Sequence, residues 1–249
     1  MKKLLIIILF FAGWQGSRAQ DPGAREIIQK ADDKNRGLSS QGTMTMTVIR
    51  PDWTRTISMK TWSKFREYSL VLITAPAKDK GQVFLKIKSE MWNWVPSIDK
   101  TIKIPPSMML QSWMGSDFTN DDLVKQSSIV VDYTHKLLGR EKVREMDCYK
   151  VELTPLPDAP VVWGKVIMWV TVRGFDVWMA EYYDEDNKLV NVSNNYDIRR
   201  MGDRDIPTRL EMVPVNKKGQ KTVMQIDELK FNTGIDEHFF SQQNMKKIK

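Results

Sequence analysis

Apolar and polar residues alternate with a period of two along most of the chain, and this alternation predicts β-strands. The clearest run spans residues 43–48 and reads Thr-Met-Thr-Met-Thr-Val. Similar runs continue as far as residues 222–231, and we interpret residues 129–133 and 143–154 as two of them. The pattern predicts a mainly β protein with about ten or eleven antiparallel strands. A sheet of that size curls toward a barrel or splits into a sandwich.

One departure from this pattern is an N-terminal helix. Asp21 is a suitable N-cap, Pro22 suits the first helical position, and Gly37 suits the C-terminal end. Apolar residues at i, i+3, i+4 and i+7 predict one apolar stripe, formed by Ala24, Ile27, Ile28 and Ala31. A helix with a single stripe needs a surface on which to lie.

The other departure is residues 105–125, which are rich in Met and aromatic side chains. Within this segment, Thr119 and Asp122 have the spacing of a loose capping box, which predicts a short helix through Leu123. A plain β-sandwich would not need such an insertion.

The first residues have the pattern of a secretory signal peptide. Two lysines follow the initial Met, residues 4–12 are an unbroken apolar run, and small residues precede Gln20 at the positions that signal peptidase reads. The apolar run is too short to cross a bilayer core about 30 Å thick, so an anchor helix is the less favoured alternative. We expect residues 1–19 to be removed and residues 20–249 to form one exported domain.

The net charge of +7 changes its meaning once this segment is set aside. Three of the positive charges, on Lys2, Lys3 and Arg18, lie in the predicted signal peptide, which contains no acid. The remaining excess is mild and spread over the chain, so it does not predict a nucleic-acid-binding surface.

Residues that commonly carry out chemistry are sparse. The sequence has no Gly-rich phosphate loop, H-E-x-x-H or G-x-S-x-G pattern. The one cysteine, Cys148, lies in an apolar alternation and is interpreted as a small buried side chain. Its two potential bases, His135 and His238, are about a hundred residues apart. The acidic residues 184–186 fit a solvated turn better than a Ca²⁺ site. We predict no catalytic residue, metal or cofactor.

The 15 Met and 9 Trp residues are the more informative feature. Met adapts its shape and is frequent at apolar binding surfaces that accept varied ligands. Two interpretations stay open: these side chains all belong to the core, or some of them line a cavity for flexible acyl chains.

Two motifs in the middle of the chain resemble a known family. Residues 92–96, Trp-Asn-Trp-Val-Pro, resemble its W-x-Y-x-P strand end. Residues 111–123, Gln-Ser-Trp-Met-Gly-Ser-Asp-Phe-Thr-Asn-Asp-Asp-Leu, resemble its S-F-M-G-S-D-F-x-x-x-D-L motif. The family is the outer-membrane lipoprotein-sorting family (LolA/LolB-like), and weaker similarity extends through residues 20–249. Trp94 and Trp113 replace the family's usual Tyr and Phe and keep an aromatic ring at both positions.

The resemblance implies a strongly curved, incomplete antiparallel barrel whose concave face is covered by short helices. It also implies a non-enzymatic binder or carrier of lipid or lipoprotein acyl chains in the periplasm of a Gram-negative bacterium. An inner-membrane transporter and an outer-membrane receptor are the implied membrane partners. The candidate lipid-binding residues, eight on strands and five on the Met-rich segment, are Met44, Met46, Ile57, Met59, Leu70, Leu72, Trp92, Trp94, Met108, Met109, Trp113, Met114 and Phe118.

Two other functions are kept as alternatives. The protein could be an interaction module that serves an inner-membrane transporter and fills its cavity with its own side chains. A secreted hydrolase that uses Ser116 or Asp117 is less favoured, because the sequence shows no general base near them that could activate a nucleophile.

Overall fold

The computed structural model describes residues 22–124, 128–157, 159 and 161–249. The predicted signal peptide and the predicted cap Asp21 lie outside these residues. No helix in the described ranges combines the length and the apolar character needed to cross a membrane.

Helix α1 (Ala24–Arg36) carries the predicted apolar stripe. Ile27, Ile28 and Ala31 are fully buried. The prediction of Pro22 at the first helical position is wrong, because Gly23 is the N-cap and the helix begins one residue later. Gly37 ends the helix with φ 66°, a left-handed conformation that favours glycine.

In the part of the chain that the structure describes, thirteen strands form one antiparallel sheet. The strands are β1 (Ser39–Ile49), β2 (Thr54–Lys64), β3 (Tyr68–Ala75), β4 (Val83–Ile87), β5 (Glu90–Val95), β6 (Lys100–Ile104), β7 (Tyr133–Val143), β8 (Met146–Pro155), β9 (Lys165–Thr171), β10 (Val177–Tyr183), β11 (Leu189–Met201), β12 (Arg204–Pro214) and β13 (Lys221–Phe231). The short helices are η1 (Pro96–Ile98), η2 (Pro106–Met108), η3 (Trp113–Gly115), α2 (Asn120–Val124), η4 (Ser128–Val130), η5 (Glu237–Phe239) and α3 (Gln242–Met245).

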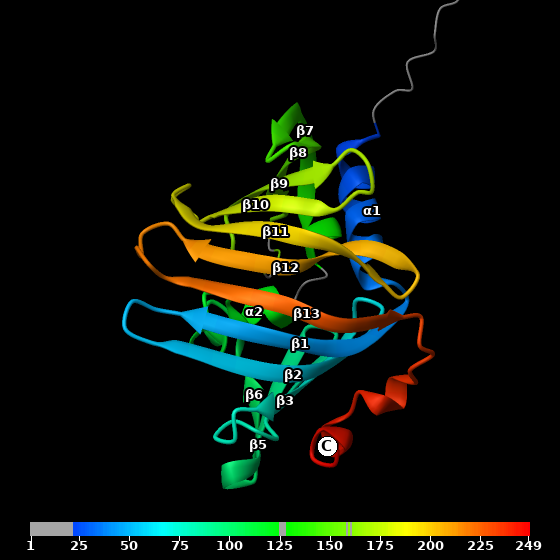
Figure 1. Cartoon of the computed structure of the whole chain (residues 1–249). Coiled ribbons are helices and arrows are strands. Elements are labelled where there is room, and N and C mark those ends of the chain that lie inside the picture. The colour runs from blue at the N-terminus through cyan, green and yellow to red at the C-terminus, as the bar shows by residue number, and fades with distance from the viewer. Residues whose placement is uncertain (1–21, 125–127, 158, 160) are drawn as a thin grey trace, which may run out of the picture.

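The sheet consists of two meanders joined at its centre. Strands β1 to β6 are neighbours in chain order, as are β7 to β13, and β1 pairs with β13. Strands β6 and β7 are the two edges, so the sheet is curved but open (Figure 1). This confirms the predicted mainly β, incomplete barrel, with thirteen strands instead of about ten or eleven.

The strand predicted at residues 143–154 corresponds to β8 and begins three residues too early, whereas the strand predicted at residues 129–133 is wrong. Residues 129–130 belong to η4, while β7 and β8 form a hairpin whose turn is Arg144–Glu145. Both turn residues have positive φ, 45° and 70°, without the Gly or Asn that usually marks such a turn. Strand β7 was missed because it is an edge strand and mostly exposed, so it lacks a strong apolar alternation.

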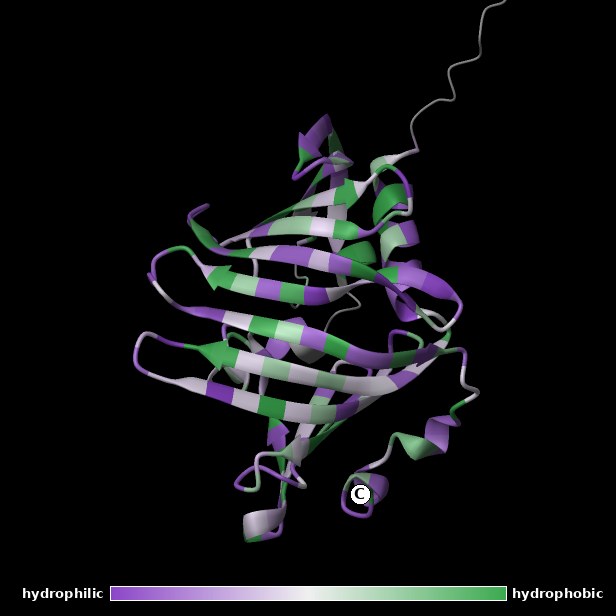
Figure 2. Ribbon diagram, viewed as in Figure 1, coloured by the Kyte–Doolittle hydropathy of each residue, from purple (hydrophilic) through white to green (hydrophobic). Residues whose placement is uncertain are grey.

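Alternate residues of each strand point to opposite faces of the sheet, and the alternation of hydrophobic and hydrophilic residues is visible along several strands in Figure 2. On the inner face, α1 packs against β7 and β9. The same face carries the segment between β6 and η4, which we name the lid segment (residues 105–124). On the outer face, the C-terminal segment (residues 235–248) packs through α3 against β4.

Three groups of buried apolar side chains hold these layers together. The lid cluster, beneath the lid segment, comprises Met46, Val48, Ile57, Met59, Ile73, Phe84, Met91, Ile104, Met109, Trp113, Phe118, Met212 and Met224. The helix cluster, beneath α1, comprises Ile27, Ile28, Ala31, Val130, Tyr133, Tyr149, Val151, Leu153, Trp163, Val166, Met168, Val170 and Ala180. The outer cluster, beneath the C-terminal segment, comprises Leu70, Leu72, Val83, Leu85, Trp92, Trp94, Phe240 and Met245.

Candidate functional site

The lid segment is a short, mostly irregular stretch that inserts large side chains into the inner face of the sheet. Met109, Trp113 and Phe118 are 4%, 2% and 3% exposed. Trp113 packs edge-on against Phe84 of β4, with the ring centroids 5.2 Å apart. The lid segment therefore supplies part of the core as well as covering it.

The C-terminal end of the lid segment is fixed by a capping box, as the sequence predicted. The backbone N–H of Asp122 donates to Oγ1 of Thr119 (3.0 Å), and the backbone N–H of Thr119 donates to Oδ2 of Asp122 (2.8 Å). The other carboxylate oxygen of Asp122 accepts from Nε1 of Trp163, just before β9, at 2.9 Å. Burial raises the pKa of Asp122, although these hydrogen bonds act in the opposite direction. The lid segment is thus bonded to the second meander at this end.

The tip of the lid segment is held to the first meander and β13 by one nearly enclosed ion pair. Nη1 of Arg50 donates to Oδ2 of Asp117 at 2.9 Å, and the two side chains are 12% and 4% exposed. Oγ1 of Thr222 donates to the same carboxylate oxygen (2.7 Å) and accepts from the backbone N–H of Asp117 (2.9 Å). The guanidinium of Arg50 also donates to the carbonyl oxygen of Gly115 at 2.9 Å. We name Arg50, Asp117 and Thr222 the latch.

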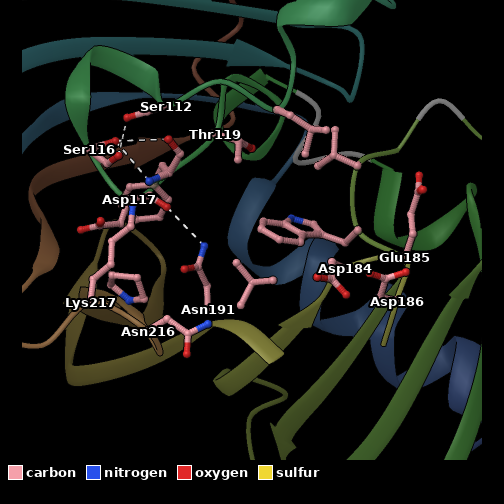
Figure 3. A pocket seen from close by; sticks show the side chains of 16 residues that line it. Ser112, Ser116, Asp117, Thr119, Asp184, Glu185, Asp186, Asn191, Asn216 and Lys217 are labelled. Atoms are coloured by element: carbon pink, nitrogen blue, oxygen red, sulfur yellow. Dashed lines mark hydrogen bonds between the residues drawn. The ribbon is translucent and has the colours of Figure 1, made fainter. Parts of the chain in front are cut away.

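A pocket of about 630 Å³ opens beside the lid segment (Figure 3). Its apolar residues come from the lid segment, the loop before β9, and strands β11 and β12. Its polar residues include an acidic turn, the β12–β13 turn and Asp117 of the latch. Amide Nδ2 of Asn191 donates to the carbonyl oxygen of Asp117 at 3.5 Å across it. The lining residues are Leu110, Ser112, Ser116, Asp117, Phe118, Thr119, Val162, Trp163, Asp184, Glu185, Asp186, Val190, Asn191, Pro214, Asn216 and Lys217. The pocket lies where the lid cluster, through Phe118, meets the helix cluster, through Trp163.

The structure brings together most of the predicted lipid-binding residues. Met46, Ile57, Met59, Met109, Trp113 and Phe118 are members of the lid cluster, and Met44 and Met114 pack against it. Met108 lies in the lid segment but is 37% exposed.

Four of the predicted lipid-binding residues lie on the opposite face of the sheet. Leu70, Leu72, Trp92 and Trp94 belong to the outer cluster, beneath the C-terminal segment. The eight candidate residues on strands therefore do not lie on one face of the sheet. The inner positions of these strands are their neighbours, which sequence reasoning missed: Val71, Ile73 and Met91.

The latch was also missed by sequence reasoning, because its members are far apart in the chain and each is an ordinary residue. Asp117 was considered only as part of a turn or of a hydrolase site. Ser116 is bonded within that turn: its hydroxyl donates to the carbonyl oxygen of Phe118 (3.4 Å) and accepts from the N–H of Phe118 (3.2 Å). His135 bonds through Nε2 to the carbonyl oxygen of Ile129 at 2.7 Å. Ser116 and His135 therefore each bond to the backbone of a nearby residue.

The other residues singled out for possible chemistry have structural roles. Burial raises the pKa of Cys148 to about 11, so its thiol stays protonated at neutral pH. In the acidic turn, a carboxylate oxygen of Asp184 accepts from the N–H of Lys188 at 2.8 Å. Within the described residues, no three His, Cys, Asp or Glu side chains are grouped so that they could hold a metal ion.

Comparison with known proteins defines the class to which this fold belongs. A crystal structure of a LolA superfamily protein from Nitrosomonas europaea is 26% identical, with a TM-score of 0.78, covering 90% of this chain and 99% of that one. A structure described as an outer membrane lipoprotein-sorting protein domain, from Vibrio parahaemolyticus, is 21% identical, with a TM-score of 0.80 and coverage of 90% and 98%. A DUF1329 family protein from Desulfovibrio piger is 24% identical, with a TM-score of 0.83 and coverage of 89% and 97%. The fold is LolA-like, which confirms the resemblance found in the sequence.

The chain belongs to a family whose model, described only as "-like: Uncharacterized protein", matches residues 66–247. No curated protein matches the sequence.

Proposed function

We propose that the protein is a non-enzymatic periplasmic binder that shields acyl chains of lipids or lipoproteins from water. The observation that carries this proposal is the lid cluster, whose inner-face Met and Ile side chains are covered by a short, irregular segment instead of by a long helix or a second sheet. Cover of this kind can be exchanged for another apolar chain. The LolA-like fold and the predicted signal peptide support the same proposal.

The energetics of such an exchange are close to balance. Removing Met109 and Phe118 from the inner face exposes side chains whose burial is worth about 1.5–3 kcal/mol each, and opening the tip of the lid segment breaks the ion pair of the latch, which is worth about 1.5–3 kcal/mol. A long acyl chain gains about 0.8 kcal/mol for each buried CH₂, or roughly 10 kcal/mol in all. Because the two amounts are comparable, an acyl chain can replace the lid side chains and can later be released.

The pocket beside the lid segment provides a point of entry for this exchange. Its volume of about 630 Å³ lies within the range of small-molecule sites, roughly 300–1,000 Å³. A chain that enters there meets Phe118 and Trp163 first, at the boundary between the two inner clusters. Transfer between the inner and outer membranes, with a transporter and a receptor as partners, is the task that we propose for the filled site.

A second candidate is an interaction module of an inner-membrane transporter without a lipid of its own. One observation favours it: the inner face is filled by the protein's own side chains, with Trp113 only 2% exposed. In that function the lid segment is permanent core.

Native mass spectrometry of the protein purified from the periplasm tests the first proposal, together with displacement of a fluorescent fatty acid. We expect bound lipid and saturable uptake. Ile57→Asp, in the inner face that the acyl chain would contact, should abolish uptake, whereas Met108→Asp, at an exposed position of the lid segment, should retain it. Absence of bound lipid together with absence of uptake would exclude the carrier function. If the wild type takes up no fatty acid and the buried substitution only lowers the stability of the protein, the interaction module is favoured.

A further inference from the structure

One polar atom within the lid cluster has no hydrogen-bond partner. The indole Nε1 of Trp113 is buried, and no acceptor lies within reach of it among the described residues. An indole N–H is a donor only, and its burial without an acceptor is unfavourable. Other indoles of the protein are satisfied: Trp163 donates to Asp122 at 2.9 Å, and Trp178 donates to the carbonyl oxygen of Val143 at 3.1 Å.

The surroundings of Trp113 favour a neutral acceptor. The ring packs against Phe84 and, with Met91 and Lys86, lines a void of about 10 Å³. The ammonium of Lys86 donates to the carbonyl oxygen of Arg66 at 2.8 Å. A carboxylate or phosphate would have to lose its water against Phe84 and Met91, which costs far more than burying a carbonyl group that gains one hydrogen bond.

We propose that Trp113 recognises the carbonyl oxygen of an ester-linked acyl chain. This inference rests on the proposed acyl-chain binding and adds the chemical class of the ligand. When an acyl chain replaces Met109 and Phe118 on the inner face, Trp113 keeps its contact with Phe84, and the first carbonyl of the chain accepts from its Nε1. The protein thereby distinguishes acyl esters from hydrocarbon chains that lack a carbonyl group.

The discrimination follows from the donor that would otherwise stay unpaired. An ether-linked chain buries the same number of CH₂ groups but offers a much poorer acceptor than a carbonyl, so it leaves the indole N–H with little or no compensation. One neutral hydrogen bond in an apolar site corresponds to about a tenfold difference in affinity. Trp113→Phe removes the donor and keeps the aromatic ring, so the variant should bind both kinds of chain equally.

Competition between two matched phospholipids tests this inference. Dipalmitoyl phosphatidylglycerol and its dihexadecyl ether analogue are each used to displace a fluorescent fatty acid from the full-length mature protein. We expect the wild type to prefer the ester by about tenfold and Trp113→Phe to lose this preference. Trp94→Phe, a substitution at another buried Trp (8% exposed) in the outer cluster, is the matched control and should keep the preference.

The outcomes separate this inference from the proposed function. If the wild type binds both lipids equally, or if Trp113→Phe keeps the preference, the role of Trp113 is refuted while acyl-chain binding stands. If neither lipid nor the fluorescent fatty acid binds, the proposed function fails and the inference fails with it. A second measurement needs no variant: the indole N–H resonance of Trp113 should shift downfield with the ester lipid and not with the ether. An unchanged resonance would overturn the proposal.

Discussion

Replacing Asp117 by asparagine should loosen the tip of the lid segment. The substitution keeps an oxygen that can accept from Thr222 but removes the charge that faces Arg50 at 2.9 Å. A hydrogen bond to a charged group contributes about 1.5–3 kcal/mol, against about 0.5–1.5 kcal/mol for a neutral one. Solvent screening is small because both side chains are nearly enclosed. Arg50 keeps its bond to Gly115, which limits the loss to about 2 kcal/mol.

A loss of that size changes the opening equilibrium of the lid segment by about thirtyfold. Hydrogen exchange followed by mass spectrometry measures this change directly. The backbone N–H groups of Trp113 and Asp117, which bond to Phe118 and Thr222, should exchange about thirtyfold faster in the variant. If the acyl-chain site is accessible only when the lid segment is open, the apparent affinity for a fluorescent fatty acid should strengthen in the same proportion.

Asp176→Asn provides a matched control. Asp176 forms an ion pair with Lys34 at 2.6 Å, and its side chain is as buried as that of Asp117, but it joins α1 to the turn before β10. This variant should change global stability and leave exchange in the lid segment unaltered. If Asp117→Asn lowers the unfolding midpoint without faster exchange in the lid segment, the latch is ordinary core structure and the reasoning is refuted.

Two further predictions concern ionisable groups. Burial raises the pKa of Asp122 above its unfolded value of about 3.9, so the folded state loses stability as pH rises from that value through the folded pKa. The free energy of unfolding of Asp122→Asn, relative to that of the wild type, should therefore be higher at pH 7 than at pH 4, as measured by urea denaturation. The same difference between the two proteins at both pH values would contradict this. Burial raises the pKa of Cys148 to about 11, so its reactive thiolate is scarce in the folded protein. At pH 8, iodoacetamide should therefore alkylate the native protein at least about a hundredfold more slowly than the urea-unfolded chain, as measured by intact mass. Equal rates would show that the thiol is exposed.

The sheet could be predicted because most strands have one apolar face and one polar face, which gives a clear period of two. Strand β7 could not, because an edge strand with both faces largely exposed has no such period. The positive-φ turn at Arg144 and Glu145 also lacks the residue types that mark hairpins. Helix α1 was recognisable from its stripe, since Ile27 and Ile28 face a single surface.

The lid segment could be located because it interrupts the alternation, but the wall beneath it could be assigned only in part. Strand β3 is apolar at four consecutive positions, residues 70–73, because the lid segment covers one face and the C-terminal segment covers the other. A period of two cannot identify the inner face of such a strand. Strand β5 presents the same ambiguity at Met91 and Trp92. The outer face of these strands is identified by the C-terminal segment that covers it. The sequence of β3 and β5 gives no sign that this distant segment packs there.

The pairing of β1 with β13 has a consequence for how the chain reaches this structure. Each meander is built from hairpins that close over short loops, whereas Leu38 and Asn232 are bonded across 194 positions. Closing so long a loop is entropically costly and slow, so the central seam of the sheet is expected to form after the hairpins on either side. Until it forms, the inner edges of both meanders expose unpaired N–H and C=O groups to other chains. A newly made molecule is thus most prone to aggregate at the strands that later become its most protected.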